Sequence, residues 1–93
     1  MNSETFESVW DAICDTTEEA ANMKARSELM LNIRERVKAW GITQEEAAKR
    51  LHLTRPRLND LLRGKIDKFS LDALVNIATA AGLVLQIKVT EAA

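Results

Sequence analysis

The stretch TQEEAAKRLHLTRPRLNDLLRG at residues 43–64 decides the fold. It predicts two short helices joined by a three-residue turn at 52–54. Thr43 and Thr54 stand where each helix needs a side-chain cap, and Pro56 falls in the first turn of the second helix, where proline is tolerated. Two helices joined by so short a turn form the helix-turn-helix pattern.

Basic side chains are concentrated around this pattern. Residues 49–68 hold seven Lys or Arg side chains against two acidic ones, which is typical of a surface that binds phosphate. If the second helix enters the major groove of DNA, its exposed polar residues face base edges. The candidates for base contacts are Arg55, Arg57 and Asn59. The candidates for phosphate contacts are Gln44, Thr54, Arg63 and Lys65.

Other interpretations of this region stay open. The basic cluster could be a solvated face, or the two helices could serve protein interaction alone, although Arg55, Arg57 and Lys65 together argue against the latter. Asp60 is an acid on the exposed side of the second helix. It either accepts a hydrogen bond from cytosine or, as we favour, orients Arg57 or Arg63 three residues away.

The N-terminal segment 1–22 has the opposite charge, with six acidic and no basic side chains. Its apolar residues recur at helical spacing with acids on the other side, which predicts an amphipathic helix. Such a helix suits docking on a protein partner, but the same stripe could pack on the domain's own core. The stripe is formed by Phe6, Val9, Trp10 and Ile13. Cys14 on the same stripe is expected to act as a small hydrophobe.

Residues 23–82 complete the expected helical domain. The sequence from Ala20 to Trp40 favours helix throughout, and Gly41 ends it, but one helix and two shorter pieces are both compatible with the pattern. A further helix is expected between a cap at Ser70 and Gly82. The expected core residues include Ile33, Val37, Trp40, Phe69 and Leu74.

Residues 83–93 follow a different pattern, because apolar and polar residues alternate from Leu83 to Thr90 as in a half-buried strand. The chain offers no second strand candidate, and an unpaired strand is not stable alone. We therefore expect a homodimer in which this strand pairs antiparallel with its copy. The residues expected at the dimer contact are Leu85, Ile87 and Val89. The alternative is a frayed tail.

The chemical inventory excludes several classes of protein. With one His and one Cys among 93 residues, the chain lacks the ligands of a zinc site and the partners of a nucleophile–base pair. It has no glycine-rich phosphate loop and no apolar run near the ~20 residues that span a bilayer. The sequence therefore predicts a non-enzymatic cytoplasmic protein without metal or cofactor, and no role for a membrane or a small-molecule substrate.

Residues 41–82 resemble the lambda-repressor-like (Xre/Cro) helix-turn-helix family. The segments FESVW (6–10), RSELM (26–30) and LLRGKIDKFSLDALVNIA (61–78), with the closing strand, look like small antitoxins of the HigA type. The resemblance implies a mainly α, five-helix repressor fold that binds a palindromic operator as a dimer. It also implies neutralisation of a RelE-like toxin, a small basic protein that cleaves mRNA on the ribosome. The alternative is a free-standing phage-type repressor without a toxin partner.

Two positions depart from that family's pattern. His52 begins the turn, where relatives usually carry glycine because the backbone there is left-handed, and histidine is among the few other residues tolerated. Arg55 stands where relatives commonly carry glutamine. Because arginine makes its best bidentate contact with guanine and glutamine with adenine, we expect a guanine at the corresponding operator position.

Overall fold

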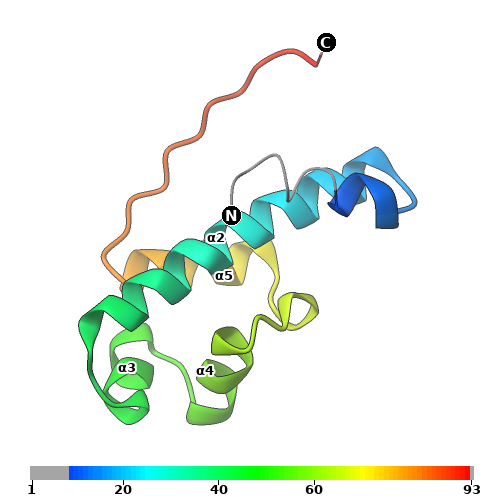
Figure 1. Ribbon diagram of the computed structural model, residues 1–93. Helices are drawn as coiled ribbons and strands as arrows, with labels where there is room; N and C mark the ends of the chain where they lie inside the picture. Colours follow the sequence, from blue (N-terminus) through cyan, green and yellow to red (C-terminus); the bar gives the residue numbers. More distant parts are fainter. Residues whose placement is uncertain (1–8, 93) are drawn as a thin grey trace.

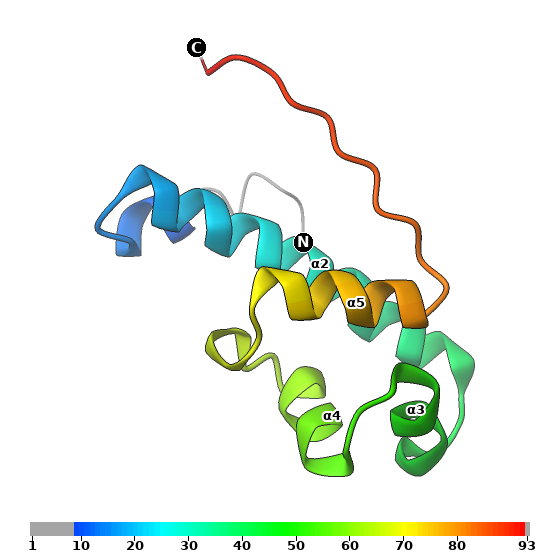
Figure 2. The same cartoon turned by 180° about the vertical axis from the view of Figure 1, so that it is seen from behind.

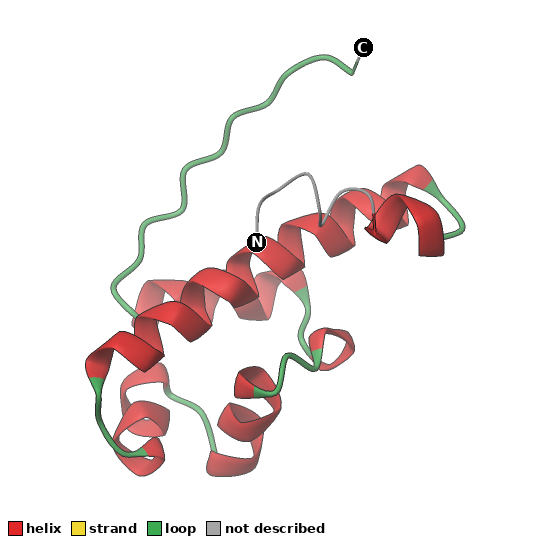
Figure 3. Cartoon of the chain, in the orientation of Figure 1, coloured by secondary structure: helices red, strands yellow, loops and turns green. Residues whose placement is uncertain are grey.

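Each of the longer helices begins after a residue whose side chain caps its first turn. The computed structural model describes residues 9–92, which form five α-helical segments and one 3-10 turn (Figures 1 and 3). The elements are a helical segment at residues 9–13, α2 (Thr17–Trp40), α3 (Gln44–Leu51), α4 (Arg55–Leu62), the 3-10 turn η1 (Ile66–Lys68) and α5 (Leu71–Ala80). The caps of the four labelled helices are Thr16, Thr43, Thr54 and Ser70, whose hydroxyls accept from the backbone amide three residues on.

Residues 17–40 form one helix of 24 residues, which settles the question that the sequence left open. Gly41 ends it in the left-handed conformation at φ 63°. In the helix-turn-helix, His52 also adopts a left-handed conformation, at φ 58°, as expected of the residue that begins the turn. The helix-turn-helix and the mainly helical fold predicted from residues 43–64 are thus confirmed.

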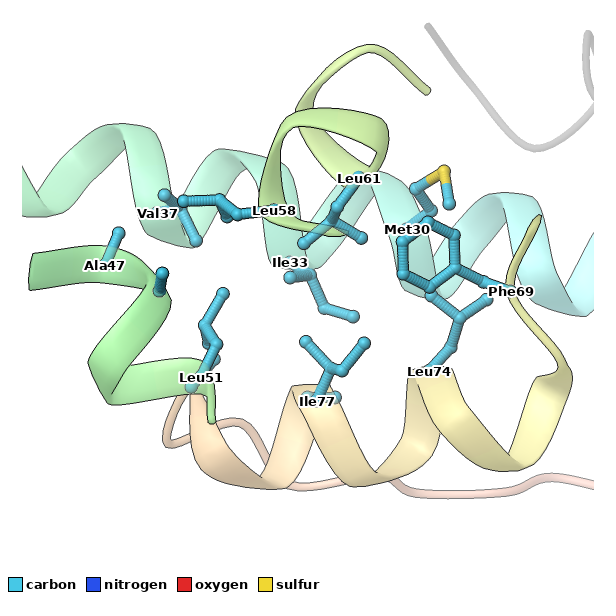
Figure 4. Packing of buried hydrophobic residues seen from close by; sticks show 13 residues of the cluster. Met30, Ile33, Val37, Ala47, Leu51, Leu58, Leu61, Phe69, Leu74 and Ile77 are labelled. Carbon is cyan, nitrogen blue, oxygen red and sulfur yellow. The ribbon is translucent and has the colours of Figure 1, made fainter. Parts of the chain in front are cut away.

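Helices α4 and α5 and the turn η1 all pack against the long helix α2. Helix α5 lies alongside it, and α3 and α4 lie together on one side of this pair (Figures 1 and 2). The apolar faces of all four helices meet between them, where Ile33, Leu58 and Leu74 point toward one another (Figure 4). The largest fully buried side chains are Ile33, Leu51, Leu58, Leu61, Phe69 and Leu74. No helix in residues 9–92 is both long and apolar enough to span a bilayer.

Trp40 departs from the expected core. Ile33, Val37, Phe69 and Leu74 are buried as predicted, whereas Trp40 is only partly buried and packs against the edge of the core. The guanidinium carbon of Arg50 lies 4.9 Å from the centroid of its indole ring. Trp40 is the last residue of α2, where the helix reaches the margin of the domain, so its ring is covered partly by a cation instead of by apolar side chains.

The expected C-terminal strand is not formed in this chain. Residues 83–92 leave α5 as an extended segment without strand pairing (Figures 1 and 3). A strand requires a neighbouring backbone, and the described residues contain no other strand, so none forms in the single chain. Pairing with a second copy stays a prediction. The apolar residues of the segment stay exposed, with Ile87 at 76% and Val89 at 86%.

Candidate nucleic-acid interface

The helix-turn-helix, formed by α3 and α4, lies on the side of the molecule opposite the C-terminal segment (Figures 1 and 2). The N-terminal ends of α3 and α4 are found at the same edge, the lower one in Figures 1 and 2. Leu58 and Leu61 bury the inner face of α4 in the core, while Arg55, Pro56 and Asn59 are exposed. Because helix N-termini favour anions, this edge is suited to a phosphate backbone.

Most of the predicted contact residues are accessible on this edge. Arg55 and Asn59 on α4 are exposed, and so is Gln44 at the first position of α3. Arg63 is exposed as well, but it follows the other end of α4. Thr54 is exposed as well, while its hydroxyl accepts a hydrogen bond from the Arg57 amide at 3.3 Å. Thr54 therefore caps α4 whether or not it also contacts phosphate.

Arg57 has a different setting from the other arginines of α4. Its Nη1 donates a hydrogen bond to the carbonyl oxygen of Lys68 at 2.6 Å. Its guanidinium carbon lies 4.0 Å from the ring centroid of Phe69, which is fully buried. Arg57 thus connects α4 to the segment that leads into α5, although the sequence placed it among the base-contacting candidates.

Asp60 also contacts the segment that leads from α4 into α5. One carboxylate oxygen lies 3.4 Å from the Lys65 ammonium and the other lies 3.6 Å from the Lys68 ammonium. The expectation that Asp60 orients Arg57 or Arg63 was wrong, because the loop after α4 turns back and brings two lysines nearer to the carboxylate. The backbone bond from the Lys65 amide to the Asp60 carbonyl, 3.0 Å long, fixes this turn.

The sequence did not predict the ion pair of Lys68 with Asp60 or the contacts of Arg57 with Lys68 and Phe69. Arg57 and Lys68 are eleven positions apart and lie in different elements. Helical spacing detects neighbours three or four residues apart, so no local pattern could have joined this pair. The only signal was the presence of an aromatic residue, Phe69, beside the basic segment.

One residue of the apolar stripe in the N-terminal segment contacts α2, and two others are exposed. Trp10 donates from its indole Nε1 to the Ser27 hydroxyl at 2.7 Å, and Asp11 lies 2.8 Å from the Lys24 ammonium. Both contacts hold the segment against α2 of its own chain. Val9 and Ile13 stay exposed, at 47% and 63%. Phe6, the remaining predicted member of the stripe, lies outside the described residues.

A groove lies between the C-terminal segment and the pair of helices α2 and α5. Its lining is mostly apolar and includes Ala25, Leu29, Leu71, Val75, Leu83 and Leu85. The groove is open to solvent, and two of the three predicted dimer residues line it, namely Leu85 and Ile87. No group of three or more His, Cys, Asp or Glu side chains in residues 9–92 could hold a metal ion.

Comparison with known families agrees with this geometry. A family described as a helix-turn-helix domain matches residues 12–90, most of the chain. A comparison with curated proteins gave no significant match.

Proposed function

Because the chain belongs to the helix-turn-helix domain family, which indicates DNA-binding transcription regulation, we propose that it represses transcription by binding operator DNA as a dimer. We further propose that it is the antitoxin of a toxin–antitoxin pair and represses its own operon. The observation that carries the DNA-binding proposal is the exposed face of α4, where Arg55 and Asn59 are accessible, on a helix whose N-terminus lies at the same edge as that of α3 (Figure 1).

Specific DNA binding is tested by selecting duplexes from a random-sequence pool with the full chain. Fluorescence anisotropy then gives the dissociation constant for the selected duplex. Arg55→Ala should weaken specific binding by about 1–3 kcal/mol and remove the preference for one base pair, which we expect to contain guanine. Asn76→Ala, which changes an exposed polar residue of α5, is the control. Failure of the pool to yield any preferred sequence would contradict this proposal.

The C-terminal segment supports the dimer. A second copy is the occupant we propose for the groove, because the segment that lines it also has an unpaired backbone and exposed Leu85, Ile87 and Val89. An antiparallel copy of the segment would pair with this backbone and cover the apolar side chains, satisfying both requirements at once. An isologous contact of this kind closes as a dimer and matches a palindromic operator.

Sedimentation equilibrium tests the dimer directly. The 10.4 kDa chain should sediment with twice its mass, and Ile87→Asp should give the monomer mass because a charge would be buried at the contact. Thr90→Ala, a change on the opposite face of the same segment, should leave the dimer intact. A wild-type monomer at all concentrations tested would refute the dimer.

The N-terminal segment supports the antitoxin assignment. Val9 and Ile13 leave apolar surface exposed next to acidic side chains. This combination fits a small basic protein with an apolar groove, and the HigA-type resemblance supplies its class, a RelE-like toxin that cleaves mRNA. Trp10 is occupied by Ser27, so we assign the partner contact to Val9 and Ile13 and retain Phe6 as a candidate.

The antitoxin role is tested by tagging the chain and purifying it from its native cytoplasm. We expect a stoichiometric basic protein whose RNA cleavage is inhibited by the chain. The double variant Val9→Ser, Ile13→Ser should lose both binding and inhibition, while Ala12→Ser in the same segment should retain both. Recovery of the chain without such a protein would favour the alternative, a free-standing repressor. The Trp10–Ser27 and Asp11–Lys24 contacts favour that alternative, since they use the segment within its own chain.

A further inference from the structure

We propose that Arg57 is a positioning residue that holds Lys65 and Lys68 for phosphate contact and does not itself read a base. The inference rests on the proposed DNA binding and changes the role that the sequence suggested for Arg57. It concerns the segment 63–70, which joins the DNA-reading helix α4 to α5.

The guanidinium of Arg57 is engaged on two sides. One face stacks on the ring of Phe69, at 4.0 Å from the centroid, and Nη1 donates to the Lys68 carbonyl at 2.6 Å. A bidentate contact to guanine requires two N–H groups of the same fork. One N–H of Nη1 is committed to the Lys68 carbonyl, and the contact with the Phe69 ring fixes the plane of the guanidinium, so the protein sets the direction of the remaining N–H groups.

Phe69 makes this attachment firm. Its side chain is fully buried among the core residues, and its carbonyl oxygen accepts a hydrogen bond from Arg26 on α2 at 3.3 Å. The partner of Arg57 is therefore part of the rigid body of the domain. Through Arg57, the position of α4 and the position of the following segment are fixed relative to each other.

The same segment presents two ammonium groups. Asp60 lies within 3.4 Å of Lys65 and 3.6 Å of Lys68, so a single carboxylate holds both lysines beside the C-terminal end of α4. Their side chains remain accessible, at 38% and 55%. Arg63, Lys65 and Lys68 stand against Asp60 and Asp67 here, which leaves a net charge of +1 that can meet a phosphate. Arg57 binds the backbone of this segment, and Asp60 binds its side chains.

Arg55 in the same helix and Arg63 just after it differ from Arg57. Both are exposed, whereas Arg57 is partly buried. This contrast provides a matched pair of arginines, one available to bases and one engaged with the protein. Loss of a base contact changes the preference at one base pair, and loss of phosphate contacts weakens all sequences and reduces the salt dependence of binding.

The test uses the full chain and the duplex selected with the wild type. Anisotropy gives dissociation constants for Arg57→Met, Arg55→Ala and the wild type, over a range of NaCl concentrations and on duplexes carrying each single base-pair change. Arg57→Met retains packing over Phe69 but loses the hydrogen bond. It should reduce the salt slope by about 1–2, keep the order of base preferences and weaken all duplexes alike. Arg55→Ala should lose about 5–150-fold of discrimination at one base pair.

A double-mutant cycle separates positioning from direct contact. In the variant Lys65→Ala, Lys68→Ala the phosphate contacts are already absent, so adding Arg57→Met should change affinity by less than about twofold. An additive effect would overturn the inference. Loss of preference at a single base pair in Arg57→Met would overturn it as well, while leaving the proposed DNA binding intact. A wild-type chain that selects no duplex would refute both. Urea denaturation of each variant confirms that it is folded under the binding conditions.

Discussion

His52 allows a quantitative test of how the turn between α3 and α4 is built. It is the only non-glycine residue with positive φ in the described part of the chain, at φ 58° and ψ 40°. Its side chain is exposed, so substitution uncovers no core. The backbone amide of the next residue, Leu53, donates to the Ala48 carbonyl at 2.9 Å, a contact that requires the left-handed conformation.

The expected effect of His52→Gly is a difference between two opposing terms. A non-glycine residue in this conformation costs about 1–2 kcal/mol. Glycine restores about 0.4–1 kcal/mol of conformational entropy to the unfolded chain, which favours unfolding. The variant should therefore be more stable than the wild type by about 0.5–1 kcal/mol, which corresponds to a rise in Tm of roughly 2–8 °C for a chain of this size.

The assay is urea denaturation followed by circular dichroism, with the series His52→Gly, His52→Asn and His52→Val. Asparagine tolerates the conformation about as well as histidine and should be neutral, whereas a β-branched valine should lower stability by about 1–2 kcal/mol. Equal stability of the glycine and valine variants would show that the turn does not impose the conformation. Destabilisation by glycine of more than about 1 kcal/mol would show that the imidazole itself supports the fold.

Three further changes test other parts of the structure. Thr54→Ala removes the oxygen that accepts from the Arg57 amide and should lower the unfolding free energy by about 0.5–2 kcal/mol, while Thr54→Ser should not; both are measured in urea. Leu58→Ala empties a fully buried position and should cost about 2–5 kcal/mol in the same assay. Burial and the carboxylates led by Glu19 raise the pKa of the Cys14 thiol above its ordinary value, so its alkylation by iodoacetamide at pH 8 should be slower than that of an unstructured cysteine peptide. Glu19→Gln should accelerate that reaction, and an unchanged rate would contradict the electrostatic contribution.

Local rules accounted for the helices. Thr16, Thr43, Thr54 and Ser70 cap them where a hydroxyl precedes the first turn, because capping depends only on residues three positions apart. The same local reasoning predicted a C-terminal strand, which the single chain does not form. Its alternating pattern specifies which residues share a face, but pairing depends on a backbone that the described chain does not supply.

The sequence predicted where the candidate interface lies, but it did not predict which of the basic side chains contact other groups of the protein. Counting charges found the basic region, since net charge depends on composition alone. The count could not tell which cations were already engaged. Arg50 covers Trp40 and Arg57 covers Phe69. These partners are brought together by the packing of helices, so the surface available to DNA is smaller than the charge count indicates.

Two arginines on α2 attach both ends of α5 to the same helix. Arg26 donates to the carbonyl of Phe69, just before α5 begins, and Arg36 donates to the carbonyl of Ala81, just after it ends, at 3.1 Å. The second contact places a cation at the negative end of a helix whose own last turn has no basic residue. The point where the C-terminal segment departs is thereby fixed relative to α2, against which α4 packs. Two copies joined through that segment would hold their two α4 helices at a fixed separation. One base pair inserted between the operator half-sites would then rotate one half-site about 34° out of phase with its α4.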